Sequence, residues 1–176
     1  MRKNAMYAVF AASIFLASCG GSNENSEAQS STADTASSAT LPEVSAETTS
    51  SPVSNTVELT ADDTMKYNTT EIRVKAGEQV TLTLKNIGKM PKASMGHNFL
   101  LLGGGTDIEA FAMKAMVAKD TDYIPADLKS SIMANTKLLG PGESDTITFT
   151  VPAGTYEYIC SFPGHYAAMR GNLIAE

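Results

Sequence analysis

The chain has few of the residues that cross-link a protein or ligate a metal. Its 176 residues include two cysteines, two histidines and no tryptophan. Lysine and arginine number 13 against 19 acidic residues, so the formal net charge is -6. Because the basic residues do not cluster, we expect no binding of a phosphate backbone and no nucleic-acid partner. The length allows about one globular domain with flexible additions.

The N-terminal residues have the pattern of a bacterial secretion signal. Arg2 and Lys3 precede an apolar run from Ala5 to Ala17, which is shorter than the roughly 20 residues that a membrane-spanning helix needs. The stretch "LASC" at its end resembles the lipobox of bacterial lipoproteins, which implies cleavage before Cys19 and a lipid on its thiol. We therefore expect residues 1–18 to be a lipoprotein signal peptide and Cys19 to anchor the protein to a bacterial membrane.

Residues 19–55 have the composition of a disordered tether. Between Gly20 and Asn55 the sequence is dominated by small and polar residues, without an aromatic residue, lysine or arginine. Such a segment cannot bury enough apolar surface to offset the entropy lost on ordering. Gly20 is also compatible with onward transport, so we expect a lipid-anchored protein of the cell envelope, at the outer membrane on its periplasmic or surface side.

From Thr56 onward, apolar and polar residues alternate in short runs, which is the pattern of half-buried strands. Inward-facing positions are expected at Val57, Leu59, Ile72, Val74, Val80, Leu82, Leu84, Ile147, Phe149 and Val151, and in the later runs "TYEYIC" and "GNLIA". The runs are not separated by helical patterns long enough for parallel crossovers. The alternation therefore predicts an all-β domain over residues 56–176, folded as an antiparallel β-sandwich or barrel.

One region departs from this alternation and has helical spacing instead. The segment "DIEAFAMKAMVAKD" places Ile108, Phe111 and Ala115 on one face of an amphipathic helix. The following "PADLKSSIMA" has a weaker helical pattern that starts at Pro125. We expect these segments to form a short helical insertion over about residues 107–134.

The stretch "CSFPGHYAAM" contains three side chains that bind soft metals. Cys160, His165 and Met169 supply a thiolate, an imidazole and a thioether, and His97 is the other histidine of the chain. Two histidines, a cysteine and a methionine form the donor set of copper electron-transfer sites, because sulfur donors stabilise Cu(I) and imidazoles suit both oxidation states. Taken singly, each residue is more often a buried or gap-filling one. Together they predict a metal site, since the domain's whole supply of cysteine and histidine adjoins predicted strands.

The segments "SMGHNF", "NTKLLGPGESDTITFTV" and "CSFPGHYAAMRG", with the specific spacing C-x4-H-x3-M, carry a resemblance to a known family. In these motifs, residues 56–176 resemble the azurins, type 1 blue copper proteins of the cupredoxin family. The resemblance implies a Greek-key β-sandwich and one copper ion that alternates between Cu(I) and Cu(II). It further implies His97, Cys160 and His165 as equatorial ligands, Met169 as a distant axial ligand, and the Gly96 carbonyl on the opposite side.

The same resemblance implies roles for residues near these ligands. Asn98 corresponds to a residue that ties the two ligand loops together, and the backbone N–H of Phe162 would donate to the thiolate. Electrons would pass through His165 and an apolar surface patch around it, formed by Met65, Met95, Met116, Phe162, Pro163, Gly164 and Ala168. A modest patch is sufficient, because redox encounters use small interfaces.

These features predict a membrane-tethered carrier of single electrons in the bacterial cell envelope. Its partners would be the membrane, through Cys19, and transient redox proteins such as cytochromes or reductases, and it would act as a monomer. We expect no enzymatic activity, because a copper nitrite reductase or oxidase needs a second copper and histidines that the chain lacks. A copper-binding, storage or surface-interaction lipoprotein with incidental redox activity stays open, because it would use the same ligands.

Overall fold

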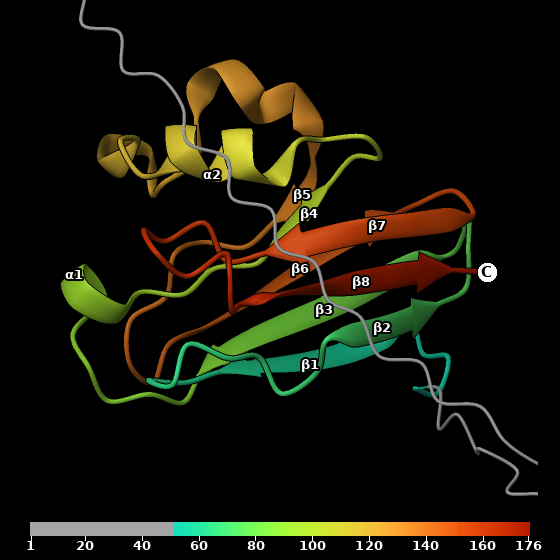
Figure 1. Ribbon diagram of the computed structural model, residues 1–176. Coiled ribbons are helices and arrows are strands. Elements are labelled where there is room, and N and C mark those ends of the chain that lie inside the picture. The colour runs from blue at the N-terminus through green and yellow to red at the C-terminus, as the bar shows by residue number, and fades with distance from the viewer. Residues whose placement is uncertain (1–50) are drawn as a thin grey trace, which may run out of the picture. The chain divides into compact units, whose positions relative to one another are not determined.

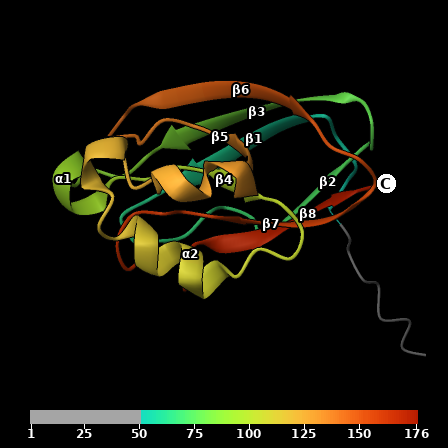
Figure 2. The ribbon, with the colours of Figure 1, turned by 90° about the horizontal axis from the view of Figure 1, so that it is seen from above.

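The computed structural model describes residues 51–176, so the predicted signal peptide, Cys19 and nearly all of the predicted tether lie outside the described residues. Within them the strands form two sheets, which pack face to face around the core (Figures 1 and 2). The three-stranded sheet has the order β1 (Thr56–Ala61), β3 (Gln79–Asn86), β6 (Ser144–Thr150). The five-stranded sheet has the order β2 (Glu71–Val74), β8 (Arg170–Ala175), β7 (Gly154–Ile159), β4 (Leu100–Leu102), β5 (Ile132–Asn135).

The core lies between the sheets and uses the alternating positions that the sequence predicts. In β3 the side chains of Val80, Leu82 and Leu84 are fully buried, while the residues between them are only partly covered. Leu101 of β4 and Tyr158 of β7 join the same apolar cluster from the opposite sheet. The predicted β-sandwich is confirmed, and burial of these apolar side chains is its main stabilising contribution.

Two strand pairs are parallel, which corrects the prediction of a purely antiparallel sandwich. β1 pairs with β3 in parallel, with Val57 beside Leu82, and β2 pairs with β8 in parallel, with Ile72 beside Leu173. Parallel neighbours need a long connection that returns the chain to the same end of the sheet. The connection from β1 to β3 passes through β2 in the other sheet, so no crossover helix is required.

The helical insertion packs on the five-stranded sheet. α2 (Ile108–Ala115) begins after Asp107, whose side chain accepts a hydrogen bond from the Ala110 N–H (3.0 Å). The buried face of α2, with Phe111 and Ala115, forms a second apolar cluster with side chains of β4 and β7. The predicted amphipathic helix is therefore confirmed. Two short 3-10 helices, η1 (Lys119–Thr121) and η2 (Ala126–Ser131), follow it.

The last residues of the predicted insertion are not helical, and the insertion ends before residue 134. The weak helical turn that follows Pro125 ends at Ser131, and the next residues form β5, which pairs with β4. The side chains of β5 alternate between half-buried and exposed, which is the period of a strand and not of a helix.

α1 (Lys92–Met95) is a single turn outside the insertion. Within residues 51–176, no helix reaches the length and apolarity needed to cross a bilayer.

Contacts of the folded domain begin slightly before the expected boundary at Thr56. The Ser54 N–H donates to the Arg73 carbonyl (2.9 Å), and the Asn55 carbonyl accepts from the Thr81 N–H (2.8 Å). The first bond adds the segment before β1 to the open edge of β2, and the second lengthens the pairing of β1 with β3 by one residue.

Candidate metal centre

The predicted donor residues meet at one end of the five-stranded sheet. His97 lies between α1 and β4, Cys160 follows β7 and Met169 precedes β8, with His165 in the loop between them (Figure 1). The ligand atoms of His97, Cys160 and His165 lie within 4.8 Å of one another. His97 and Cys160 are fully buried, and His165 is 2% exposed. Residues far apart in the sequence therefore form one buried His–Cys–His cluster.

The loop from Cys160 to Met169 is closed by its own backbone. The Cys160 N–H donates to the Met169 carbonyl (2.9 Å), and the Met169 N–H donates to the His165 carbonyl (2.8 Å). Gly164 adopts a φ of 82°, a conformation that favours glycine, and lets the chain turn immediately before His165. The turn places the His165 Nδ1 3.6 Å from the Cys160 sulfur. The fully buried Met169 is thus held next to both donors through its backbone.

His97 reaches the cluster from a separate part of the chain. Its N–H donates to the Leu139 carbonyl (3.1 Å), and its carbonyl accepts from the Leu139 N–H (2.7 Å). Gly96 precedes it in a crowded position, where a β-carbon would lie 2.8 Å from the Lys92 carbonyl oxygen and 3.1 Å from Leu138. Any side chain at Gly96 would have to displace backbone, so this close packing fixes the segment that carries the imidazole.

Asn98 links the two donor segments. Its side-chain amide donates to the Ser161 hydroxyl (2.9 Å), and its side-chain oxygen accepts from the Ser161 N–H (2.9 Å). Both residues are buried, so water does not compete for these bonds. Because Asn98 follows His97 and Ser161 follows Cys160, the two bonds fix the separation of the loops.

Burial holds the cysteine in its neutral form. It raises the pKa of the Cys160 thiol to about 11, and the backbone N–H groups of Asn98 and Phe162 oppose this rise because they favour the thiolate. The direct hydrogen bond from the Phe162 N–H to the thiolate that the resemblance implies stays a prediction. A metal cation bound beside the sulfur would lower the pKa of Cys160. The thiol would then lose its proton, and the cation would bind the thiolate.

Burial also disfavours the charged forms of both histidines. Burial, together with the smaller effect of a charge on His97, lowers the pKa of His165 to about 4. The pKa of His97 is lowered by burial as well, although the Asp62 backbone and the nearby carboxylates oppose the shift. The Asp62 backbone lies near the ring, but neither ring nitrogen of His97 has a partner with hydrogen-bond geometry within residues 51–176. Unpaired buried polar atoms are uncommon and costly, and neutral imidazoles are the form that binds a metal, so the donor set fits a metal ion.

The residues predicted to form an apolar patch are covered to different degrees. Met65 and Met116 are each 37% exposed, Gly164 and Ala168 are exposed, and Met95 and Pro163 are half-buried. Phe162 is buried, and its ring centroid lies 4.7 Å from that of His165. His165 is therefore covered by its neighbours and does not itself lie open to solvent.

Some residues at the centre carry no signal in the sequence. The Tyr67 hydroxyl donates to the Asn98 carbonyl, and the Tyr123 ring meets Phe162 edge-on at 5.0 Å between centroids. Both tyrosines are buried but stand in loops without a periodic pattern. Ser161 adjoins Cys160 in the sequence, yet its contact with Asn98 joins two loops and depends on the fold.

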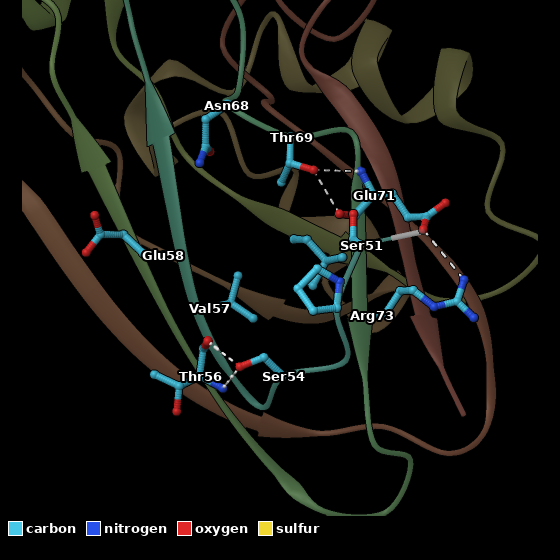
Figure 3. A pocket seen from close by; sticks show the side chains of 11 residues that line it. Ser51, Ser54, Thr56, Val57, Glu58, Asn68, Thr69, Glu71 and Arg73 are labelled. Carbon is cyan, nitrogen blue, oxygen red and sulfur yellow. Dashed lines mark hydrogen bonds and ion pairs between the residues drawn. The ribbon is translucent and has the colours of Figure 1, made fainter. Parts of the chain in front are cut away.

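A pocket of about 330 Å³ lies away from the donors, between the edge strands β1 and β2 (Figure 3). It is lined by residues of β1, β2 and the segment around Ser51, including Val57, Glu71 and Arg73. Its lining contains no histidine, cysteine or methionine, so it contributes nothing to the His–Cys–His cluster.

Known proteins resemble this chain over the whole described domain. A family model for copper binding proteins, the plastocyanin/azurin family, matches residues 53–176. Azurin-2 of Alcaligenes xylosoxydans xylosoxydans is 47% identical over 119 residues, which cover 64% of this chain and 91% of that protein. The outer membrane protein H.8 of Neisseria gonorrhoeae is 42% identical over 118 residues, 64% of this chain and 63% of that protein. The chain therefore spans less than two thirds of the H.8 protein.

A solved structure shows the same fold. Dithionite-reduced auracyanin from Roseiflexus castenholzii is 37% identical, with a TM-score of 0.63, and the match covers 71% of this chain and 99% of that chain. This likeness confirms the predicted cupredoxin-like sandwich with a short helical insertion. The buried His–Cys–His cluster fits the predicted single type 1 copper. The chain belongs to the plastocyanin/azurin family of copper-binding, electron-transfer proteins.

Proposed function

We propose that this protein carries single electrons in the bacterial cell envelope, with one type 1 copper held by His97, Cys160 and His165. The observation that carries the proposal is the buried cluster of two imidazoles and one thiol within 4.8 Å, in which neither His97 nitrogen has a partner among the described residues. When bound, copper would supply a one-electron couple between Cu(II) and Cu(I).

The protein backbone supports this role because it holds the donors independently of a metal. The His97–Leu139 bridge, the Asn98–Ser161 pair and the Cys160–Met169 bond fix each donor segment from a different direction. A site whose donors move little between oxidation states needs little reorganisation when an electron arrives or leaves. Such rigidity favours an electron carrier over a protein that must open to release its metal.

We assign Met169 as the weak axial donor and the Gly96 carbonyl as the donor on the opposite side. Met169 is fully buried and bonded through its backbone to Cys160 and His165, and Gly96 adjoins His97. Met169→Leu should keep the intense absorption but raise the reduction potential, because losing an axial donor to an apolar side chain costs the electron-poor Cu(II) more than Cu(I). Met113→Leu is the matched control, since Met113 on α2 is 56% exposed. Equal potentials in the two variants would remove Met169 from the ligand set.

Redox partners would dock on the surface formed by Met65, Met95, Met116, Phe162, Pro163, Gly164 and Ala168. The partial exposure of Met65 and Met116 and the contact of Phe162 with His165 support this assignment. Polarisable methionines suit adaptable contacts, and a small patch suits transient encounters of a monomer with cytochromes or reductases.

A lipid on Cys19 would keep the domain at the membrane, with residues 19–55 as a tether. The lipobox-like "LASC" motif and the likeness to a protein named outer membrane protein H.8 support this placement. Cells that express the full chain should carry it in the membrane fraction with a covalent acyl label. Cys19→Ser should lose the label and leave the membrane fraction. A labelled Cys19→Ser protein, or an unlabelled native one, would contradict lipid anchoring.

The copper proposal is tested by adding one equivalent of Cu(II) to the purified chain. We expect an intense blue absorption band, narrow copper hyperfine splitting in the paramagnetic resonance spectrum, and reversible one-electron voltammetry. A colourless product with ordinary tetragonal copper would contradict the ligand assignment. Blue colour without reversible voltammetry, but with rapid transfer of copper to chelators, would instead support storage. Turnover of nitrite or oxygen would indicate an enzyme.

A further inference from the structure

A buried tyrosine donates its hydroxyl proton to the segment that carries His97. Tyr67 follows β1 and is 8% exposed, and its hydroxyl donates to the backbone carbonyl of the fully buried Asn98. No other donor reaches this carbonyl oxygen within residues 51–176. A buried carbonyl that loses its donor is left unsatisfied away from water, which destabilises the fold, so the bond is a strong constraint on where Asn98 can lie.

Asn98 is the residue through which that constraint would reach both donor segments. It follows His97 directly, and its side chain makes two hydrogen bonds to Ser161, the neighbour of Cys160. Its backbone also lies near enough to the Cys160 thiol to lower the pKa of that group. A shift of the Asn98 backbone would therefore move the imidazole of one segment and alter the hydrogen bonding of the sulfur in the other.

We propose that Tyr67 is a positioning residue for the copper centre, and that its hydroxyl, through the Asn98 carbonyl, sets the place of His97 relative to Cys160. The part of this role that concerns copper rests on the proposed function. The positioning of the polypeptide itself does not depend on a metal. Tyr67 stands on the loop after β1 of the three-stranded sheet, so the bond ties that sheet to a loop of the five-stranded sheet.

The rival explanation is that Tyr67 only fills the core. Its ring meets that of Tyr158 edge-on, with 5.6 Å between centroids, and a phenylalanine could make the same contact. Tyr158 separates the two explanations because it belongs to the same aromatic cluster and its hydroxyl also donates to a backbone carbonyl, that of Thr69 (2.8 Å). Thr69 belongs to none of the donor segments. The two tyrosines thus make the same kind of bond at different places.

Tyr67→Phe and Tyr158→Phe in the full chain form a matched pair. Each should reduce the equilibrium ratio of folded to unfolded protein by about tenfold, because each leaves one carbonyl without its donor. In the metal-free protein, Tyr67→Phe should shift the amide resonances of residues 97–99 and 160–161 more than Tyr158→Phe does, although the Tyr158 ring also packs on Phe99 (5.3 Å between centroids). After Cu(II) is added, Tyr67→Phe alone should change the copper hyperfine splitting. Replacing Tyr67 with 4-aminophenylalanine, which keeps a donor at the same ring position, should restore both signals.

The outcomes separate this proposal from the proposed function. Equal effects of the two variants on the amide resonances, or none at residues 97–99 in Tyr67→Phe, would overturn the positioning role. If the native chain fails to bind copper, the proposed function fails, and the amide resonances of the metal-free variants still decide whether Tyr67 positions the His97 segment. A loss of stability without any change at residues 97–99 would reduce Tyr67 to a core residue.

Discussion

The two sheets of this protein differ in what they contribute. The three-stranded sheet alternates regularly, buries Leu59, Leu82 and Leu84, and provides no donor to the His–Cys–His cluster. The five-stranded sheet has mostly shorter strands, and the donors lie in segments that enter β4, leave β7 or enter β8. A regular sheet builds a core from one face, whereas loops at a sheet end need no periodicity and can be shaped by ligand chemistry. The difference shows that the donors lie in loops at the end of one sheet, while the buried apolar side chains of both sheets form the core around them.

The largest expected effect is the loss of the copper absorption in a protein that still folds. Cys160→Ser removes the sulfur of the cluster, so the intense absorption should disappear when Cu(II) is added. Serine is nearly the same size and can still meet the Asn98 and Phe162 N–H groups, so circular dichroism should show a folded metal-free protein. Cys19→Ser changes the other cysteine and should keep the full colour. An intensely coloured Cys160→Ser protein would show that the thiolate is not a ligand.

The next largest effect, from a substitution in the core, should lower the stability of the protein and leave the copper spectrum unchanged. Leu82 is fully buried in β3, and Leu82→Ala should lower the free energy of unfolding by about 2–5 kcal/mol, because it leaves a cavity in the core. Urea unfolding of the metal-free protein measures the loss. The copper spectrum of the fraction that remains folded should match that of the native protein. A spectral change as large as the stability change would show that core packing in β3 also shapes the donor cluster.

Acid should destabilise the folded chain through the buried histidines of the donor cluster. The pKa of His165 is about 4 in the folded chain against an ordinary 6.5, so the unfolded chain binds more protons between these values. The metal-free protein should therefore lose stability as the pH falls from 6.5 to 4, and be insensitive to this group above 6.5. Urea midpoints over this range measure the loss, which His165→Gln should reduce. An unchanged pH dependence in His165→Gln would assign the loss to other groups.

Most strands that the sequence predicts have one covered face; β7, whose Tyr158 and Ile159 are both buried, is predicted from the alternation of its tyrosines. Alternation reveals β1, β3 and β6 because their outer faces are polar. It does not reveal β4, whose Leu100–Leu102 are all buried: Leu101 faces the main core while its neighbours face α2 and the second cluster. A strand covered on both faces loses the alternation that identifies it. β5 was likewise hidden, because its short run follows a helical pattern without a break.

The donor cluster was easier to predict than the residues around it. Cys160, His165 and Met169 stand in one short motif, and a chain with two histidines leaves little choice for the second imidazole. The positions of His97 and Asn98 relative to this loop depend on hydrogen bonds between distant segments, to Leu139 and Ser161. Tyr67 gives no signal at all, because a single tyrosine in a polar loop looks the same whether its hydroxyl faces solvent or a buried carbonyl.

The smallest expected effect concerns the outer face of the three-stranded sheet. Lys85 of β3 and Glu58 of β1 form an ion pair there (2.6 Å), with side chains that are 44% and 61% exposed. Exposed pairs contribute about 0.2–1 kcal/mol, because water screens the charges and both side chains lose freedom, so Lys85→Gln should cost less than about 1 kcal/mol in urea unfolding. Added salt should shrink the difference further. A loss as large as that of Leu82→Ala would mean that the outer face stabilises the sheet as strongly as the buried face does, and that polar contacts rather than the apolar core hold this half of the sandwich together.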